Sequence, residues 1–292
     1  MLRSLYSGIS GMKGFQNNLD VVGNNIANVN TAGYKKSRIT FQDMMSQQIK
    51  ASTDPVPNGR GGTNASQVGT GSQIGAIDNV HTQGNRQNTD RNLDLQLEGD
   101  GMFILSSNPQ VNSINDAGVS FTRAGNFYLD GESRLVNSEG LFVLNTVGEA
   151  IRIPEGATQI SINGTGKISY TGGDGPEDGV TNNTFQIALA KFSNPGGLVK
   201  NGGSTYGLSA NAGLMLEENY QGGEDVPLNG FKVPGSEADG TAKVVAGALE
   251  MSNVDLSEEF TNMIIAQRGF QANTRIITTS DQILEELVNL KR

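Results

Sequence analysis

Hydrophobic positions at both ends of the chain recur at a helical spacing. Near the start they follow steps of three and four, with Gln16 and Gly23 at two skipped positions; the members are Leu2, Leu5, Ile9, Met12, Leu19 and Ile26. The far end repeats the same steps through Leu256, Phe260, Met263, Gln267, Phe270, Thr274, Ile277, Asp281, Leu284 and Val288. A sustained seven-residue repeat favours coiled-coil-like packing. We therefore predict helices across 2–28 and 254–290, about 40 and 55 Å long at ~1.5 Å per residue.

The two predicted helices are weak on their own and opposite in charge. Polar residues interrupt both hydrophobic stripes, which lowers the stability of a helix pair but fixes its register. Residues 1–50 carry six Lys/Arg and two Asp/Glu, whereas residues 247–292 carry seven acidic and four basic side chains. These features indicate a pair that is marginal alone and stable when many copies lie side by side. An ordinary helical core inside one globular domain is the alternative that the pattern leaves open.

The middle of the chain alternates as strands do. Its strand-like segments are LDLQLEGDGMFIL, VSFTRAGNFYLDGESRLVNSEGLFVL, IRIPEGATQISINGTGKISY and TNNTFQIALAKF. Asp130-Gly131, Glu139-Gly140 and Asn163-Gly164 lie between apolar runs, where such pairs predict hairpin turns. Residues 51–75 hold six glycines and two prolines among polar residues, which is typical of an extended linker.

The predicted fold is mainly β with α-helical termini, a discontinuous coiled-coil-like helical layer plus an antiparallel β domain. Its parts are a terminal helical domain of residues 1–35 and 247–292, a linker at 36–75, and a β domain at 76–246. Acidic, glycine-rich surface loops are expected at 171–183 and 216–242.

Composition and motifs argue against an enzyme. The chain of 292 residues has no cysteine, hence no thiolate nucleophile and no sulfur-rich metal site, and its one histidine, His81, has no recognisable catalytic partner. Gly99-Asp100-Gly101 predicts a tight turn, and the carboxylates of Asp174, Glu177 and Asp178 lack the ligand spacing of a calcium loop. We expect no catalytic residue, no cofactor and no metal.

Charge and hydropathy limit the classes of partner that the chain can have. The net charge is −9 overall, but residues 1–50 carry +4. Lys35, Lys36 and Arg38 form the only basic cluster and have no aromatic stacking platform beside them, so nucleic acid is not expected as a partner. No run of 18 apolar residues is present and the start lacks the pattern of a Sec signal peptide, so neither membrane insertion nor Sec export is expected.

The stretch LDVVGNNIANVNTAGYKKSRITFQDM ends a predicted helix in asparagines, which tolerate left-handed backbone and bond to neighbouring main chain. It closely resembles the N-terminal signature of the rod and hook proteins of the bacterial flagellum, and GALEMSNVDLSEEFTNMIIAQRGFQANTRIITTSDQILEELVNL resembles their C-terminal signature. FTRAGNFYLDGESRLVNSEGLFVL and ALAKFSNPGGL are similar to their shared β domain. The residues of the two terminal signatures that we expect to serve assembly are Asn24, Asn25, Ile26, Asn28, Thr31, Gly33, Tyr34, Lys35, Ser252, Asn253, Val254, Met263, Gln267, Arg268, Gln271, Asn273 and Leu284.

This resemblance implies a structural subunit exported through the flagellum's own type III apparatus. The terminal helices would be disordered in the monomer and would line the inner tube of a helical homopolymer, with the β domain outside. The partners implied are copies of itself, other axial proteins such as the distal rod and hook–filament junction, and the hook cap. The location implied is extracellular, in the hook or basal body.

The signature also bears on which axial protein this is. Asn253, Val254, Asp255, Leu256 and Ser257 with the closing LVNLKR are more similar to the hook protein, which predicts a flexible universal joint. The short span between Ile153 and Phe185 is more typical of the distal rod protein, which forms a rigid shaft. The distal rod protein is therefore the alternative assignment. A secreted β-rich surface protein is a second class. An enzyme acting on polysaccharides, with Asp94 and Glu98 as paired carboxylates, is a third.

Overall fold

The computed structural model describes residues 2–55, 57, 60–116, 118–154, 156–172, 181–215, 230–236 and 240–290. The chain forms two compact units, each built from separate stretches of sequence. Unit 1 comprises Met1–Ala27, Ser37–Asn79 and Asp255–Arg292, and unit 2 comprises Asn28–Lys36 and Val80–Val254. The mainly β fold with helical termini is confirmed, but the predicted boundary at residue 35 differs, because the segment after the first helix belongs to the β-rich unit.

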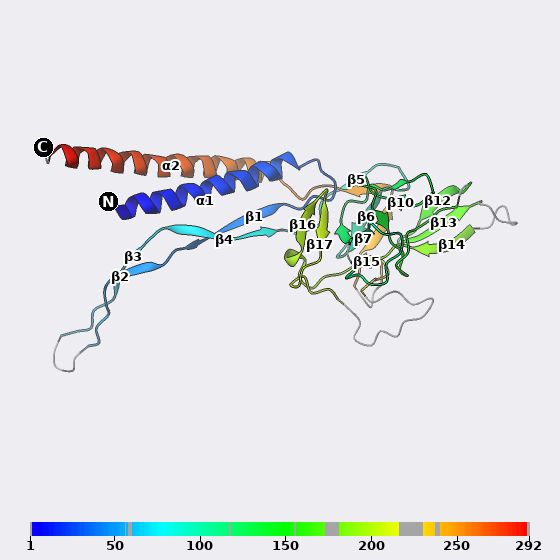
Figure 1. Ribbon diagram of the computed structural model, residues 1–292, viewed down its shortest axis with the longest axis horizontal. Coiled ribbons are helices and arrows are strands. Elements are labelled where there is room, and N and C mark those ends of the chain that lie inside the picture. The colour runs from blue at the N-terminus through cyan, green and yellow to red at the C-terminus, as the bar shows by residue number, and fades with distance from the viewer. Residues whose placement is uncertain are drawn as a thin grey trace. The chain divides into compact units, whose positions relative to one another are not determined.

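Unit 1 contains the two predicted helices, α1 (Leu2–Ala27) and α2 (Leu256–Asn289), which lie alongside each other (Figure 1). They run antiparallel, since Gly8 lies against Ile277 and Gly269 lies against Phe15. Asp255 caps α2 by accepting bonds from the backbone N–H of Ser257 at 2.8 Å and of Glu258 at 3.4 Å. The Asp255 side chain thus satisfies two backbone amides that have no partner inside the helix. This is why α2 begins directly after Asp255.

The seam between the helices differs from the predicted stripe. The side chains of α2 that turn away from solvent are Glu259, Met263, Ala266, Phe270, Asn273, Ile277, Ser280 and Leu284, at steps of four and three. Of the predicted stripe, Leu256, Phe260, Gln267, Asp281 and Val288 are exposed. The stripe is wider than one neighbouring helix covers, so α1 buries one edge and leaves the other open.

The predicted linker at 36–75 is a paired β ribbon, which corrects that interpretation. β1 (Ser37–Asp43) pairs antiparallel with β4 (Ser72–Asn79), and β2 (Ser46–Lys50) pairs with β3 (Ser66–Gly69). A Thr53–Thr63 bridge continues the pairing beyond them. Residues 51–75 are rich in glycine and polar residues, and this composition suggested a linker although β1 and β4 carry apolar residues at alternate positions, such as Ile39 and Phe41. Phe41 anchors the ribbon to α1, with ring centroids 6.0 Å from Phe15.

Unit 2 is built on an eight-stranded antiparallel sheet in the order β16-β17-β8-β7-β11-β10-β9, with β15 also on β7. Its strands are β7 (Met102–Ser106), β8 (Val119–Thr122), β9 (Tyr128–Leu129), β10 (Leu135–Val136), β11 (Phe142–Val143), β15 (Leu189–Ala190), β16 (Val199–Gly202) and β17 (Thr205–Gly207). A three-stranded sheet comprises β12 (Thr158–Ile162), β13 (Lys167–Thr171) and β14 (Thr181–Gln186), and a short 3-10 helix spans Pro195–Gly197. Two strand pairs complete the unit: β5 (Arg86–Asn88) with β19 (Ala248–Glu250), and β6 (Leu95–Glu98) with β18 (Lys243–Ala246).

The core of unit 2 lies on both faces of β7. Phe103 and Leu105 belong to one hydrophobic cluster, and Met102 and Ile104 to another, as the two-residue period of a strand requires. A strand buried on both faces forms a continuous apolar run, which is what MFIL shows in the sequence.

The predicted hairpin turns are confirmed where strands pair across them. The carboxylate of Asp130 accepts the N–H groups of Glu132 and Arg134 between β9 and β10, and the Asn163 side chain does the same for Thr165 and Lys167 between β12 and β13. The predicted loops at 171–183 and 216–242 lie largely outside the described residues, at 173–180, 216–229 and 237–239.

Candidate functional site

Asn25, near the end of α1, binds main chain through its side chain, as the sequence predicts for the asparagines there. The Asn25 side chain is buried in unit 1, where its Nδ2 donates to the Ser37 carbonyl at 2.9 Å and its Oδ1 accepts the Ser37 N–H at 3.0 Å. This two-way bond ties the end of α1 to the first residue of β1. Within unit 2, the Thr31 hydroxyl donates to the Asn28 side chain at 3.1 Å. Ile26 is half-buried and Asn24 is exposed.

Gly33 requires a left-handed backbone and a close approach. Its φ is +68°, and a Cβ there would collide with the main chain of Arg123 and Ala124. Its N–H donates to the Glu250 carbonyl at 2.8 Å. A glycine is therefore needed where the first segment of unit 2 meets β19, the strand within the C-terminal signature.

A buried ion cluster forms around Glu250. The Lys35 ammonium lies 2.5 Å from Glu250 Oε1 and donates to the Thr82 carbonyl at 2.7 Å; both charged side chains are fully buried. Arg123 Nη1 lies 3.3 Å from Glu250 Oε2, and Gly84 N–H donates to Oε1 at 2.9 Å. We call Lys35, Arg123 and Glu250 the charge cluster.

The charge cluster holds two cations and one anion, so attraction only partly offsets the loss of hydration. Burial lowers the pKa of Lys35 below its ordinary value; the Glu250 carboxylate opposes this change, and the Arg123 guanidinium adds to it. Arg123 Nη2 also donates to the Gly99 carbonyl at 2.7 Å. Every one of these contacts lies inside unit 2, where they tie its first segment to its last.

Asn253 makes a second connection between the two signatures. Its Nδ2 donates to the Val80 carbonyl at 2.8 Å and to the Thr82 hydroxyl at 2.9 Å, while its Oδ1 accepts the Lys36 N–H at 2.7 Å. Ser252 is buried and its hydroxyl accepts the Val254 N–H at 3.3 Å. Tyr34 is buried as well, and the Lys200 ammonium lies 4.1 Å from the centre of its ring.

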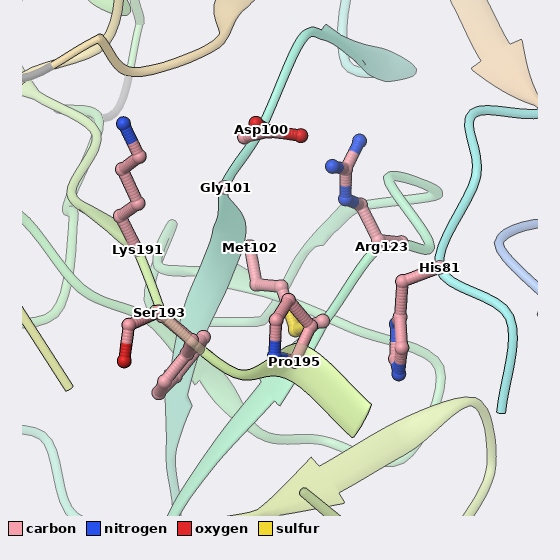
Figure 2. A pocket seen from close by; sticks show the side chains of 9 residues that line it. His81, Asp100, Gly101, Met102, Arg123, Lys191, Ser193 and Pro195 are labelled. Atoms are coloured by element: carbon pink, nitrogen blue, oxygen red, sulfur yellow. The ribbon is translucent and has the colours of Figure 1, made fainter. Parts of the chain in front are cut away.

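His81 lies beside the charge cluster and lines a pocket (Figure 2). Burial, reinforced by Lys35, Arg123 and Lys200, lowers its pKa from 6.5 to about 4, so the imidazole is neutral at pH 7. Its ring is 5.4 Å from that of Tyr206, whose pKa burial raises to about 12.

The pocket does not form a catalytic site. The other side chains that line it include Asp100, Met102, Arg123, Lys191 and Ser193. In Figure 2 the imidazole of His81 is directed away from Asp100, so the two do not form an acid–base pair. Across the part of the chain that the structure describes, no three His, Cys, Asp or Glu side chains group as a metal site would.

The open edge of the α2 stripe is the second candidate site. Phe260 is 50% exposed, Ile264 57% and Val288 67%, although all three are apolar. Of the α2 residues in the signature, Met263, Asn273 and Leu284 lie half-buried on the seam with α1, and Gln267, Arg268 and Gln271 are exposed. We use the name open face for all exposed apolar residues of α2, which lie on both sides of the seam with α1: Leu256, Phe260, Ile264, Ile265, Ile276, Ile283, Leu287 and Val288.

The sequence prediction missed Glu250 and Arg123. Both lie in segments that we quoted for their resemblance, GALEMSN and FTRAGN, yet neither was singled out. A charged residue directly after the apolar run Ala248-Leu249 is the signal that could have drawn attention to Glu250, because a buried charge needs a partner.

Three family descriptions match the chain. Residues 5–35 match "Flagella basal body rod protein", residues 96–170 match "Flagellar hook protein FlgE/F/G D1 domain", and residues 245–290 match "Flagellar basal body rod FlgEFG protein C-terminal". The FlgG basal-body rod protein of Bacillus subtilis (strain 168) is 49% identical over 292 residues, with both chains covered in full. The chain belongs to the family of bacterial flagellar rod and hook proteins.

Two further relatives are less similar to this chain. The FlgG rod protein of Borreliella burgdorferi is 34% identical over 292 residues, again across the whole of both chains. The FlgE hook protein of the same organism is 28% identical over 466 aligned positions, far more than this chain's 292 residues. The chain is therefore a structural axial subunit of the flagellum rather than an enzyme, and it resides in the hook–basal body. None of the described helices is long and apolar enough to cross a membrane.

Proposed function

We propose that this chain is the subunit of the distal rod, the rigid shaft of the flagellar basal body. The observation that carries the proposal is the 49% identity to a FlgG rod protein over an alignment of 292 residues that covers both chains in full. The alignment with the hook relative, by contrast, extends over 466 positions, so long stretches of that protein have no counterpart in this chain. The proposal therefore departs from the hook assignment that the C-terminal signature favours. It agrees with the alternative, the distal rod protein, which the short span between Ile153 and Phe185 indicates.

The structure of unit 1 supports a role in polymerisation. The open face leaves large apolar side chains exposed along most of α2, and such a surface on an exported protein is a site for contact with other chains. Copies that repeat a heterologous contact around an axis build an open helical tube. In this proposal the helices line the tube, unit 2 lies outside them, and the helices of a free subunit are disordered until they dock. Other axial proteins and the type III export apparatus are further proposed partners.

The ribbon of unit 1 supports a shaft rather than a joint. An unpaired glycine-rich linker would let the parts of a subunit shift, whereas the ladders of β1–β4 and β2–β3 fix the backbone. A two-stranded ribbon is marginally stable alone. Met45, Ile49 and Val68 are exposed on or beside β2 and β3, so neighbouring subunits in a rod can cover and lock it.

Deletion of the gene in its own bacterium tests the proposal. We expect electron micrographs of purified basal bodies to show the proximal rod without its distal part, and a plasmid copy to restore it. Basal bodies with a complete rod and no hook would assign the chain to the hook instead. Labelling an epitope placed at Gly131, where an added side chain meets no other atom, gives an independent readout of where the subunit lies.

A further inference from the structure

The segment that leaves α1 and the segment that leads into α2 bind each other inside unit 2. Lys35 and Glu250 are 215 positions apart, and both are fully buried. The same two segments also meet through the bond from Gly33 N–H to the Glu250 carbonyl and through the bond from Lys36 N–H to the Asn253 side chain. We call residues 28–36 the first arm and residues 248–254 the last arm.

The number of charges makes these contacts interdependent. With the last arm absent, Lys35 and Arg123 would share a buried space with no anion, and two unpaired cations in a protein interior are strongly unfavourable. Glu250 supplies the only carboxylate within a salt-bridge distance of either cation among the described residues. In turn, Glu250 without the first arm loses the Lys35 ammonium, one of its two cationic partners.

We propose that the charge cluster is a two-part latch, in which the docking of each arm in unit 2 depends on the other. Because β19 and the last arm are among the final residues of unit 2 to be made, the latch cannot close until nearly the whole chain is present. The first arm leads to α1 and the last arm to α2, so one buried carboxylate ties together the points at which the two helices leave the β-rich unit. The latch is a property of the folded subunit and holds whichever axial structure the chain builds.

An unequal effect of the two charge removals distinguishes a latch from ordinary packing. Glu250→Gln leaves Lys35 and Arg123 with no anion, so Lys35 either stays charged without a partner or gives up its proton, and both cost free energy, whereas Lys35→Met leaves Arg123 and Glu250 as a balanced pair. We therefore expect the glutamine variant to open the latch far more than the methionine variant. A packing defect would instead make Lys35→Met the more damaging change, because glutamine closely matches the size of Glu250 while methionine shortens the buried side chain.

Hydrogen exchange of the full-length protein, followed by mass spectrometry, provides the test. Peptides covering the arm opposite to each substitution are compared with Glu98→Gln, a matched change at an exposed position on β6. We expect Glu250→Gln to speed exchange in residues 31–36 by about 100-fold or more, and Lys35→Met to speed exchange in residues 248–254 by about tenfold. The control should change either arm less than about threefold.

Two results would overturn the latch. One is faster exchange confined to the arm that carries the substitution, and the other is an effect of Lys35→Met equal to or larger than that of Glu250→Gln. Should Glu250→Gln unfold unit 2 altogether, Lys35→Met and Asn253→Ala still decide the matter. The latch requires each of these milder variants to loosen both arms while peptides from β7 and β8 keep their protection, and loss confined to one arm contradicts it.

Discussion

His81 is buried among cations, so its protonation links the stability of unit 2 to pH. Its pKa is about 4 in the folded protein and 6.5 when unfolded. Between these values the unfolded chain binds a proton that the folded chain does not, so stability is full above pH 6.5 and falls as the pH drops toward 4. We expect the wild type to lose about 2 kcal/mol more than His81→Phe between pH 7 and pH 5. Urea unfolding at the two pH values measures the difference, and parallel losses in both proteins would refute it.

The contacts of individual residues follow from the fold and not from local sequence patterns. The resemblance singled out Gly33, Lys35 and Asn253 for assembly between subunits, and the structure places their contacts inside one subunit. Their role in assembly is still a prediction, which these contacts do not test. Glu250 was missed because its partner lies 215 positions away, and local patterns carry no information about pairing over that distance.

At the level of elements, glycines set how closely the helices of unit 1 approach. A Cβ at Gly269 would lie 2.6 Å from the Phe15 ring, whereas a Cβ at Gly23 meets nothing within 4 Å. Both glycines are inside helices, where alanine is favoured by up to about 1 kcal/mol. We expect Gly23→Ala to raise the melting temperature of the helices and Gly269→Ala to lower it, since overpacking costs about 1–3 kcal/mol. Circular dichroism at 222 nm during heating of the assembled polymer, in which the helices are ordered, measures both, and equal stabilisation by the two changes would show that the helices do not pack closely at Phe15.

The elements with a periodic or turn-specific signal were predicted correctly. The helices follow a heptad pattern, and the Asp130 and Asn163 turns have side chains that bind their own backbone. The ribbon was not predicted, because the glycine-rich composition of residues 51–75 suggested a linker and the Thr53–Thr63 bridge joins two polar residues with no hydrophobic pattern around them. The α2 seam was misplaced by part of a turn for a different reason. A stripe wider than one neighbour can cover does not reveal which of its edges that neighbour buries.

At the scale of the whole molecule, the chain returns to unit 1 after building unit 2. The predicted boundary at residue 35 assigned the end of the N-terminal signature, which follows the first helix, to the helical domain. The boundary instead falls at Ala27, since the segment 28–36 gains its contacts from unit 2. The repeat and the opposite charges of the two ends predicted that the terminal helices pair, and the structure shows this pairing; their contact with other copies is still a prediction.

The open face of α2 carries the last prediction. Phe260 and Ile264 are half-exposed in the subunit, so replacing both with serine should leave the folded subunit nearly as stable as before. If copies pack on this face, the double change removes apolar burial worth about 1 kcal/mol or more per side chain and raises the critical concentration for polymerisation by about tenfold or more. Thr278→Ser with Gln282→Ser is the matched control, with the same spacing on exposed polar positions of α2.

Sedimentation of polymer from purified subunits measures the critical concentration, and urea unfolding confirms that the monomer is intact. A critical concentration equal to that of the control would exclude this face from the subunit contacts, whereas a selective rise would locate them on the part of the stripe that α1 leaves uncovered.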